Sequence, residues 1–133
     1  MMRILLDTSA YAAFMRGHQG VQAALQGAEE IYLTPVILGE LLAGFMRGRH
    51  RKKNEGELVA FLTSPRVDVV TMDRETGERY ALILHGLRRA GTPIPTNDIW
   101  IAGSAMQHGL RILTTDAHYL KVTQAVVDFI ESA

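Results

Sequence analysis

Four acidic residues, far apart in the sequence, occupy positions where carboxylates could do chemistry. Asp7 directly follows a short apolar run at residues 4–6, and Asp116 follows a second apolar pair after two threonines. Glu40 and Asp98 lie in two apolar segments with helical spacing. Four carboxylates gathered at one place would repel one another strongly unless a cation compensated their charge. Their convergence would therefore define a divalent metal site.

Glu40 is the acid that is hardest to explain as an ordinary surface residue. Residues 35–46 read Pro-Val-Ile-Leu-Gly-Glu-Leu-Leu-Ala-Gly-Phe-Met, so this helix has no polar face for a carboxylate. An isolated ionised carboxylate in apolar surroundings is costly, so it should be paired, protonated or bound to a cation. A structural salt bridge to an arginine, such as Arg3 or Arg111, is the alternative that the sequence leaves open.

The other three acids also have structural alternatives. Asp7 and Asp98 could each cap a helix, and Asp116 could be a turn residue. The helix that Asp98 opens carries Ala102, Gly103 and Ala105, which are small enough to let it approach the sheet closely. The case for a functional site therefore rests on the four acids together.

The ligand chemistry favours Mg²⁺ or Mn²⁺, because carboxylate oxygens suit these hard cations. The chain has no cysteine, and no paired-histidine motif is present, which argues against zinc. An acidic site with such a cation can bind a phosphodiester oxygen, activate water and stabilise both the attacking and the leaving oxygen. The chemistry that this arrangement predicts is hydrolysis of nucleic acid.

The acids are positioned by an alternation of short apolar strands and helices. Such alternation predicts an α/β domain with a parallel sheet, in which ligands collect beyond the carboxyl ends of the strands. The strands are expected at residues 4–6, 31–33, 67–70, 112–113 and 126–130. The helices are expected at residues 8–15, 21–28, 35–47, 54–62, 74–90 with Asp73 as cap, and 98–108.

Length and composition limit what the chain can be. Its 133 residues, 47% of them hydrophobic, predict one domain spanning residues 1–133 with a sizeable core. The 14 Lys and Arg balance the 14 Asp and Glu, so a nucleic acid would have to meet a local basic patch. The longest uncharged apolar stretch, residues 31–39, is too short to span a bilayer, and a signal-peptide pattern is missing. We therefore expect a cytoplasmic protein without membrane contact.

Four short motifs, together with their order along the chain, resemble those of the PIN-domain nucleases. Among these nucleases, the chain is most similar to the VapC-type toxins of toxin–antitoxin pairs. They are Asp7-Thr8-Ser9 after the first strand, Glu40 in its apolar helix, Asn-Asp-Ile-Trp-Ile-Ala at residues 97–102, and Leu-Thr-Thr-Asp-Ala-His-Tyr at residues 113–119. The resemblance covers essentially the whole chain, in length and in element order. Its departures are small: His118-Tyr119 stands where many relatives have His-Phe, and Gly103 where alanine is frequent.

This resemblance implies a PIN-like, three-layer α/β fold with a central, mainly parallel sheet of four or five strands flanked by helices. It implies that Asp7, Glu40, Asp98 and Asp116 bind the metal, with the hydroxyls of Ser9 and Thr114 supporting the site. The implied activity is that of a magnesium- or manganese-dependent endoribonuclease. The implied partners are an RNA substrate, a small cognate antitoxin that binds near the active site, and a second copy of the chain in a homodimer.

A basic run follows the Glu40 helix. Arg47, Arg49, Arg51, Lys52 and Lys53 lie within seven residues of one another and could track the phosphates of RNA. A solvated loop is the simpler interpretation of the same residues. The sequence does not decide between the two.

Two other functions remain compatible with the sequence. The chain could be a PIN nuclease that processes RNA without an antitoxin. It could also be a receiver-like signalling module with a phospho-accepting aspartate, although Asp7 has no adjacent acid and no lysine follows Asp116 in the expected place. We weigh the nuclease above the receiver on these grounds.

Overall fold

A fully parallel, five-stranded sheet forms the centre of the computed structural model, which describes residues 2–132. The strand order is β3-β2-β1-β4-β5, so the winding direction reverses between β1 and β4. In open parallel sheets, ligands bind beyond the carboxyl ends of the strands at such a reversal. The predicted parallel α/β sheet is confirmed. Its strands are β1 (Arg3–Leu6), β2 (Glu30–Leu33), β3 (Val67–Val69), β4 (Arg111–Thr114) and β5 (Val127–Phe129).

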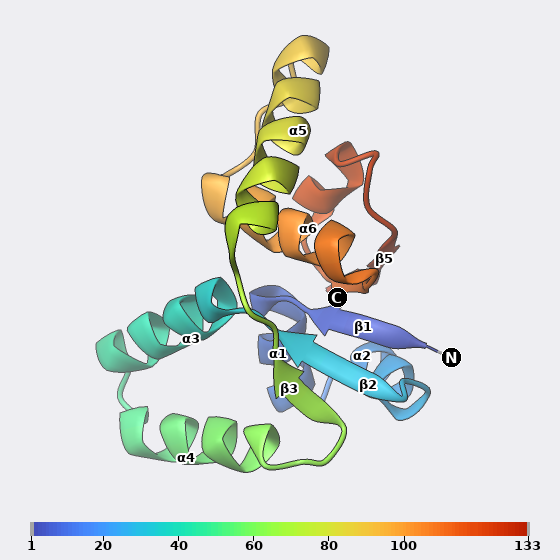
Figure 1. Ribbon diagram of the computed structural model, residues 1–133. Coiled ribbons are helices and arrows are strands. Elements are labelled where there is room, and N and C mark those ends of the chain that lie inside the picture. The colour runs from blue at the N-terminus through green and yellow to red at the C-terminus, as the bar shows by residue number, and fades with distance from the viewer. Residues whose placement is uncertain (1, 133) are drawn as a thin grey trace.

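Helices cover both faces of the sheet. In Figure 1, α5 and α6 lie on one side, α1, α2 and α4 lie on the other, and α3 runs outward from the carboxyl end of β2. This gives the three layers expected from the sequence. The helices are α1 (Thr8–Met15), α2 (Gln19–Gln26), α3 (Pro35–Arg47), α4 (Arg51–Leu62), α5 (Arg74–Ala90), α6 (Thr96–His108) and the short 3₁₀ helix η1 (Ala117–Lys121).

The central strands are buried on both faces, as their uninterrupted apolar sequences require. Ile4, Leu5 and Leu6 of β1 are each at most 2% exposed, and the apolar pair of β4, Ile112 and Leu113, is equally buried. The two strands pair in register, with Leu6 opposite Leu113. The residues that follow them are consequently held by a rigid support.

Short polar signals set the helix boundaries. Thr34 caps α3 by accepting a hydrogen bond from the Ile37 amide, and Pro35 occupies the first helical turn. Asp73 and Thr76 form a reciprocal capping box at the start of α5, and Gly91 ends that helix at φ 68°. These boundaries agree with the sequence-based expectations.

Three expected helix starts are wrong. Helix α2 begins at Gln19, because the His18 side chain caps it, and α4 begins at Arg51. Helix α6 begins at Thr96, so Asp98 lies inside its first turn and is not its cap. A carboxylate in a first turn still interacts favourably with the helix dipole, which explains why the sequence pattern was ambiguous there.

The small residues of α6 serve a contact that the sequence did not identify. We expected Gly103 to bring α6 close to the sheet, but it faces α5. A Cβ atom at this position would lie 3.3 Å from the backbone nitrogen of Tyr80 and 3.5 Å from the carbonyl oxygen of Thr76. The close packing of α5 against α6 therefore depends on a missing side chain.

Substituting Gly103 with alanine should destabilise the fold by about 1–3 kcal/mol, because the new methyl group meets backbone atoms that cannot rotate away. The matched control is Gly56→Ala in α4, where a Cβ has nothing within 4 Å. This control should be stabilising by about 0.4–1 kcal/mol, since alanine restricts the unfolded chain. Urea unfolding measures both, and equal effects of the two substitutions would contradict the packing argument.

Candidate metal centre

Asp7 is the most buried acid of the site and lies at the reversal between β1 and β4. It caps α1 by accepting a hydrogen bond of 2.8 Å from the Ala10 amide. Its carboxylate also accepts hydrogen bonds from the Ser9 hydroxyl at 2.8 Å and the Thr114 hydroxyl at 2.8 Å. The capping role that the sequence suggested is thus real, and the same carboxylate joins the ends of two strands.

The two hydroxyls also fix the loop after β4. Ser9 Oγ accepts a hydrogen bond from the Thr115 amide at 3.1 Å, and Thr114 Oγ1 accepts one from the Asp116 amide at 2.9 Å. Each hydroxyl can therefore donate to Asp7 while it accepts from this loop. Asp116 is placed beside Asp7 by this chain of hydrogen bonds.

Burial raises the pKa of Asp7 from 3.8 to about 6, although the hydrogen bonds from Ala10, Thr114 and Ser9 oppose the change. The charge of Asp116 contributes in the same direction as burial. Burial also raises the pKa of Asp98, and the charges of Asp116 and Glu40 add to this effect. The four acids predicted from the sequence are therefore close enough to act on one another electrostatically.

Glu40 is held by neutral donors. Its Oε1 accepts a hydrogen bond of 2.5 Å from the Thr8 hydroxyl, and its Oε2 accepts one of 3.2 Å from the Asn97 amide. Among residues 2–132, no ion pair joins Glu40 to a lysine or arginine. Arg3 pairs with Glu30 instead, and Arg111 with Asp128. The salt-bridge alternative for Glu40 is therefore not what the structure shows.

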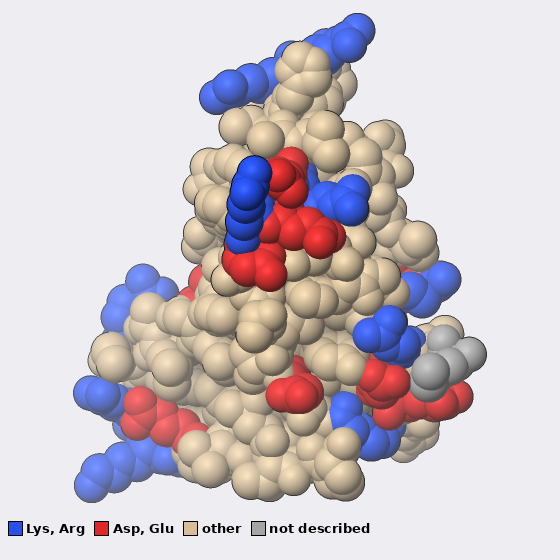
Figure 2. Space-filling model, in the orientation of Figure 1, with Lys and Arg blue, Asp and Glu red and all other residues tan. Residues whose placement is uncertain are grey.

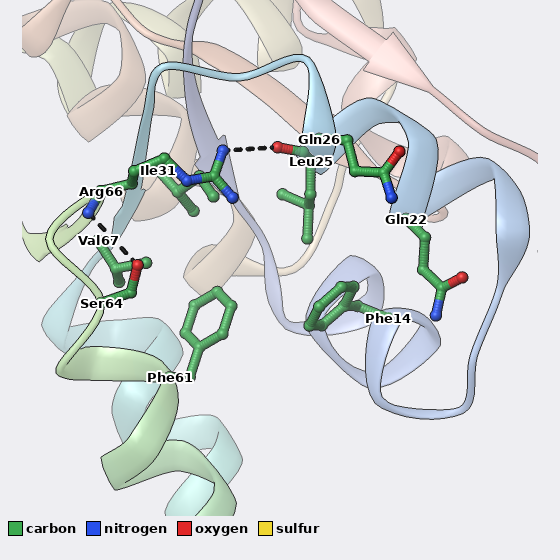
Figure 3. A pocket seen from close by; sticks show the side chains of 9 residues that line it. All are labelled: Phe14, Gln22, Leu25, Gln26, Ile31, Phe61, Ser64, Arg66 and Val67. Carbon is green, nitrogen blue, oxygen red and sulfur yellow. Dashed lines mark hydrogen bonds between the residues drawn. The ribbon is translucent and has the colours of Figure 1, made fainter.

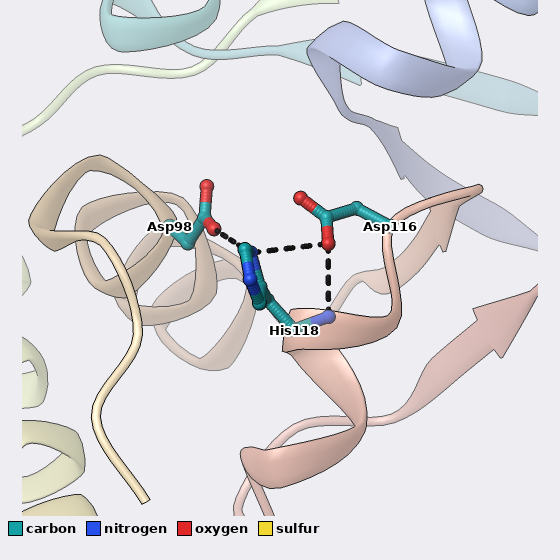
Figure 4. A group of neighbouring side chains, drawn as sticks. All are labelled: Asp98, Asp116 and His118. Atoms are coloured by element: carbon teal, nitrogen blue, oxygen red, sulfur yellow. Dashed lines mark hydrogen bonds and ion pairs between the residues drawn. The ribbon is translucent and has the colours of Figure 1, made fainter.

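Asp98 and Asp116 face one another across an imidazole ring (Figure 4). His118 Nδ1 lies 3.4 Å from Asp98 Oδ2 and 3.1 Å from Asp116 Oδ1. One ligand atom from each of the three residues falls within 4.8 Å of the others. Asp116 also accepts a hydrogen bond from the His118 amide at 2.9 Å, which caps η1. This triad has the composition and compactness of a cation site.

One atom of this triad is left without a hydrogen bond. Asp98 is only 8% exposed, and its Oδ2 is buried without a hydrogen-bond partner among the described residues. An unsatisfied buried carboxylate oxygen is costly unless a cation meets it. The carboxylate oxygens of Asp98 and Asp116 suit a hard divalent cation such as Mg²⁺ or Mn²⁺. The residues present therefore fit a divalent metal.

Four residues of the site were not assigned a role from the sequence. Thr8 and Asn97 orient Glu40, His118 lies between two aspartates, and the Tyr119 hydroxyl donates to Asp98 at 3.3 Å. All four lie within three residues, along the sequence, of one of the predicted acids. Their closeness to the acids along the sequence was the signal that could have identified them as site residues.

The basic run lies at the other end of α3 from the sheet. Arg47 ends α3, and Arg51, Lys52 and Lys53 form the first turn of α4, so the run is largely helical. Figure 2 shows basic side chains gathered over this α3–α4 end, at the lower left. Arg51 is paired with Glu55 at 3.3 Å. All five basic residues of the run are exposed.

A hollow lies at the opposite end of the sheet and is not part of this centre. It has a volume of about 420 Å³ and is bordered by Ile31 and Val67 at the amino ends of β2 and β3. Phe14 and Phe61 lie beside each other at its border, with ring centroids 5.9 Å apart (Figure 3). Arg66 closes one side by donating to the Leu25 carbonyl at 3.0 Å. Among residues 2–132, no acidic side chain lines this hollow.

Comparison with known proteins identifies the family. The family model for the PIN domain matches residues 4–125, so the chain belongs to the PIN domain family. Ribonuclease VapC4 of Mycobacterium tuberculosis is 34% identical over 87 residues, which cover 65% of this chain and 67% of that protein. Ribonuclease VapC1 of Rickettsia felis is 28% identical over 127 residues, which cover 94% and 93%. The resemblance to VapC-type PIN domains is confirmed.

Solved structures agree with this assignment. The crystal structure of VapBC2 from Rickettsia felis, bound to a DNA fragment from their promoter, matches with a TM-score of 0.85 at 19% identity, covering 98% of this chain and 100% of that one. FitAcB from Neisseria gonorrhoeae matches with a TM-score of 0.76 at 26% identity, covering 96% of each chain. The first likeness shows the fold.

Within residues 2–132, no helix has the length and apolar character to cross a membrane.

In the absence of metal, the protein should lose stability as the pH rises from about 4 to 6. The pKa of Asp7 is about 6 when folded and 3.8 ordinarily, so the folded chain holds the proton in this range and the unfolded chain releases it. Full ionisation of Asp7 lowers the free energy of unfolding by up to about 3 kcal/mol. Urea unfolding in chelator at several pH values measures this loss.

Asp7→Asn should flatten that pH dependence, since the substituted side chain does not ionise. Asp68→Asn, which changes an exposed aspartate in β3, should keep the wild-type slope. Equal slopes in all three proteins would show that Asp7 does not titrate as described.

Proposed function

We propose that this chain is a divalent-metal-dependent endoribonuclease, and that it is the toxin of a type II toxin–antitoxin pair. The PIN family match and the VapC ribonucleases among its relatives support the nuclease assignment. The observation that carries the metal dependence is the convergence of Asp98, Asp116 and His118 around a buried, unsatisfied carboxylate oxygen. Mg²⁺ or Mn²⁺ is the cofactor that the carboxylate oxygens of Asp98 and Asp116 favour.

The protein residues have distinct parts in the proposed reaction. Asp98 and Asp116 hold the cation with His118 beside them, and Asp7 and Glu40 complete the negative site. Ser9 and Thr114 keep Asp7 oriented through their hydroxyls. When bound, the cation favours attack of water on a phosphodiester and stabilises negative charge on the phosphate oxygens.

Glu40 is suited to accept a proton or to orient water at the edge of the site. Both of its oxygens receive a hydrogen bond from a neutral donor, Thr8 or Asn97, which fixes the plane of the carboxylate without neutralising it. It remains half-buried, so one side of the carboxylate is open to a bound substrate. We therefore place the attacking water between Glu40 and the metal-binding acids.

The basic run is proposed to bind the RNA backbone. Arg47 lies two helical turns beyond Glu40 on the same face of α3, about 10 Å away at 1.5 Å per residue. Lys52 and Lys53 start α4, where cations oppose the helix dipole, so they do not stabilise the helix that carries them. A phosphate chain running from Glu40 along α3 would meet these charges.

A cognate antitoxin and a homodimer are proposed as partners. Several matched structures are described as VapBC or toxin–antitoxin complexes, which supports a protein partner for this chain. A PIN nuclease that processes RNA without an antitoxin is the second candidate. The receiver-like alternative is not retained, because receivers have strand order 2-1-3-4-5 and this sheet has β3-β2-β1-β4-β5.

The purified chain should cleave single-stranded RNA with Mg²⁺ or Mn²⁺ and should stop on addition of chelator. Asp98→Asn and Asp116→Asn should each lower the cleavage rate by roughly 100-fold or more, because each removes a charge that holds the cation. Asp68→Asn, outside the cluster, should cleave at the wild-type rate. Retained cleavage in folded Asp98→Asn and Asp116→Asn would contradict the proposed site.

Replacing Lys52 and Lys53 together with glutamine should weaken RNA binding and make it less sensitive to salt. For single strands, each phosphate contact contributes about −0.7 to the slope of log K against log salt concentration. Loss of two contacts in the double substitution should therefore reduce the magnitude of this slope by about 1.4. Binding is measured by anisotropy in chelator, which keeps the RNA intact. The control replaces Arg88 and Arg89 at the end of α5; a slope lowered equally by both pairs would indicate non-specific attraction.

A further inference from the structure

The Tyr119 hydroxyl lies at the buried side of the metal centre. Tyr119 belongs to η1 and is 1% exposed, so its ring is part of the core. Its hydroxyl donates a hydrogen bond to Asp98 Oδ1 at 3.3 Å. Among the residues that the structure describes, this hydroxyl makes no other hydrogen bond. The one polar atom of this side chain is therefore committed to an acid of the site.

This contact makes the two oxygens of Asp98 unequal. Oδ1 receives the Tyr119 hydroxyl, whereas Oδ2 has no hydrogen bond and faces His118 Nδ1 at 3.4 Å. The terminal torsion of an aspartate is broad and soft, so nothing in its own covalent structure holds the carboxylate in one orientation. A donor fixed to Oδ1 leaves Oδ2 directed toward His118 and Asp116.

We propose that Tyr119 is a positioning residue that sets Asp98 Oδ2 as a preformed ligand for the divalent cation. The proposal rests on the metal-dependent function proposed above and extends it to a residue outside the acidic set. Ligands that are oriented by a hydrogen bond bind metal more tightly, because less freedom is lost on binding. Removal of the hydroxyl should therefore act on cation affinity and leave the chemistry at saturating cation unchanged.

The core alone does not account for this hydroxyl. The aromatic ring fills the space, and phenylalanine would fill it equally well without a polar atom to bury. Tyr11 is a second buried tyrosine of this chain, and its hydroxyl differs from that of Tyr119 in having no contact with the site. It is 2% exposed, and its hydroxyl is buried without a hydrogen-bond partner among the described residues. Tyr11 faces a hollow bordered by Leu41 and Phe45, away from His118 and the aspartates.

The test is Tyr119→Phe, with Tyr11→Phe as the matched control. Calorimetry with Mn²⁺ alone, without RNA, should show about tenfold weaker binding for Tyr119→Phe and unchanged binding for Tyr11→Phe. The Mn²⁺ concentration that gives half-maximal cleavage should rise by the same factor. The rate at saturating Mn²⁺ should stay within about twofold, and thermal unfolding in chelator checks that each variant is folded.

A second measurement separates action through Asp98 from a general loss of packing. If Tyr119 acts by orienting Asp98, then Tyr119→Phe should have no further effect on Mn²⁺ affinity in an Asp98→Asn background. An additional loss in that background would overturn the proposal. Unchanged Mn²⁺ affinity in Tyr119→Phe alone, with wild-type binding intact, would overturn it while leaving the proposed function standing. Absence of Mn²⁺ binding by the wild type would overturn the proposed function, and this inference with it.

Discussion

The fold brings four mutually repelling carboxylates to one edge of the sheet, and the residues around them are arranged to tolerate this repulsion. Asp7, Glu40, Asp98 and Asp116 act on one another electrostatically, and Asp7 and Asp98 are mostly shielded from water. The chain does not relieve this repulsion with arginine or lysine. It surrounds the acids with hydroxyls, an amide and backbone N–H groups, which orient the carboxylates and leave their charge in place, and with one imidazole, that of His118, between Asp98 and Asp116. Four carboxylates against one imidazole leave a net negative charge that is available to a cation.

The fold supplies the rigidity that this arrangement requires. Parallel strands buried on both faces end side by side, so the residues after β1 and β4 are fixed relative to each other. Helix α6 brings Asn97 and Asp98 to the same edge, and its packing against α5 through Gly103 holds it there. Backbone, packing and polar contacts thus specify one geometry, and a small movement of α6 would separate Asp98 from Asp116.

Much of this could be predicted from the sequence, for physical reasons that can be named. The strand-end rule placed Asp7 beside Asp116, and the absence of a polar face on α3 identified Glu40 as unusual. The orientation of Glu40 by Thr8 and Asn97 could not be predicted, because it depends on the angle at which α6 meets α3. Small residues on α6 indicated a close contact, but their spacing does not say which neighbour makes it. His118 was missed because a histidine near an acid is common on exposed turns.

Asp7 has a structural role and a role in the metal centre at the same time. Its carboxylate caps α1 and, through Thr114, ties the first strand to the fourth, so it belongs equally to the architecture and to the centre. Glu40 and Asp116 carry less of the fold, since both are half-buried and Asp116 caps a short 3₁₀ helix. Loss of the centre without loss of the fold consequently has open routes through those two residues, whereas a replacement at Asp7 must still accept hydrogen bonds from the Ala10 amide and the Thr114 hydroxyl to preserve the fold. Asparagine meets this requirement without a charge, so position 7 can lose the metal ligand and keep the helix cap.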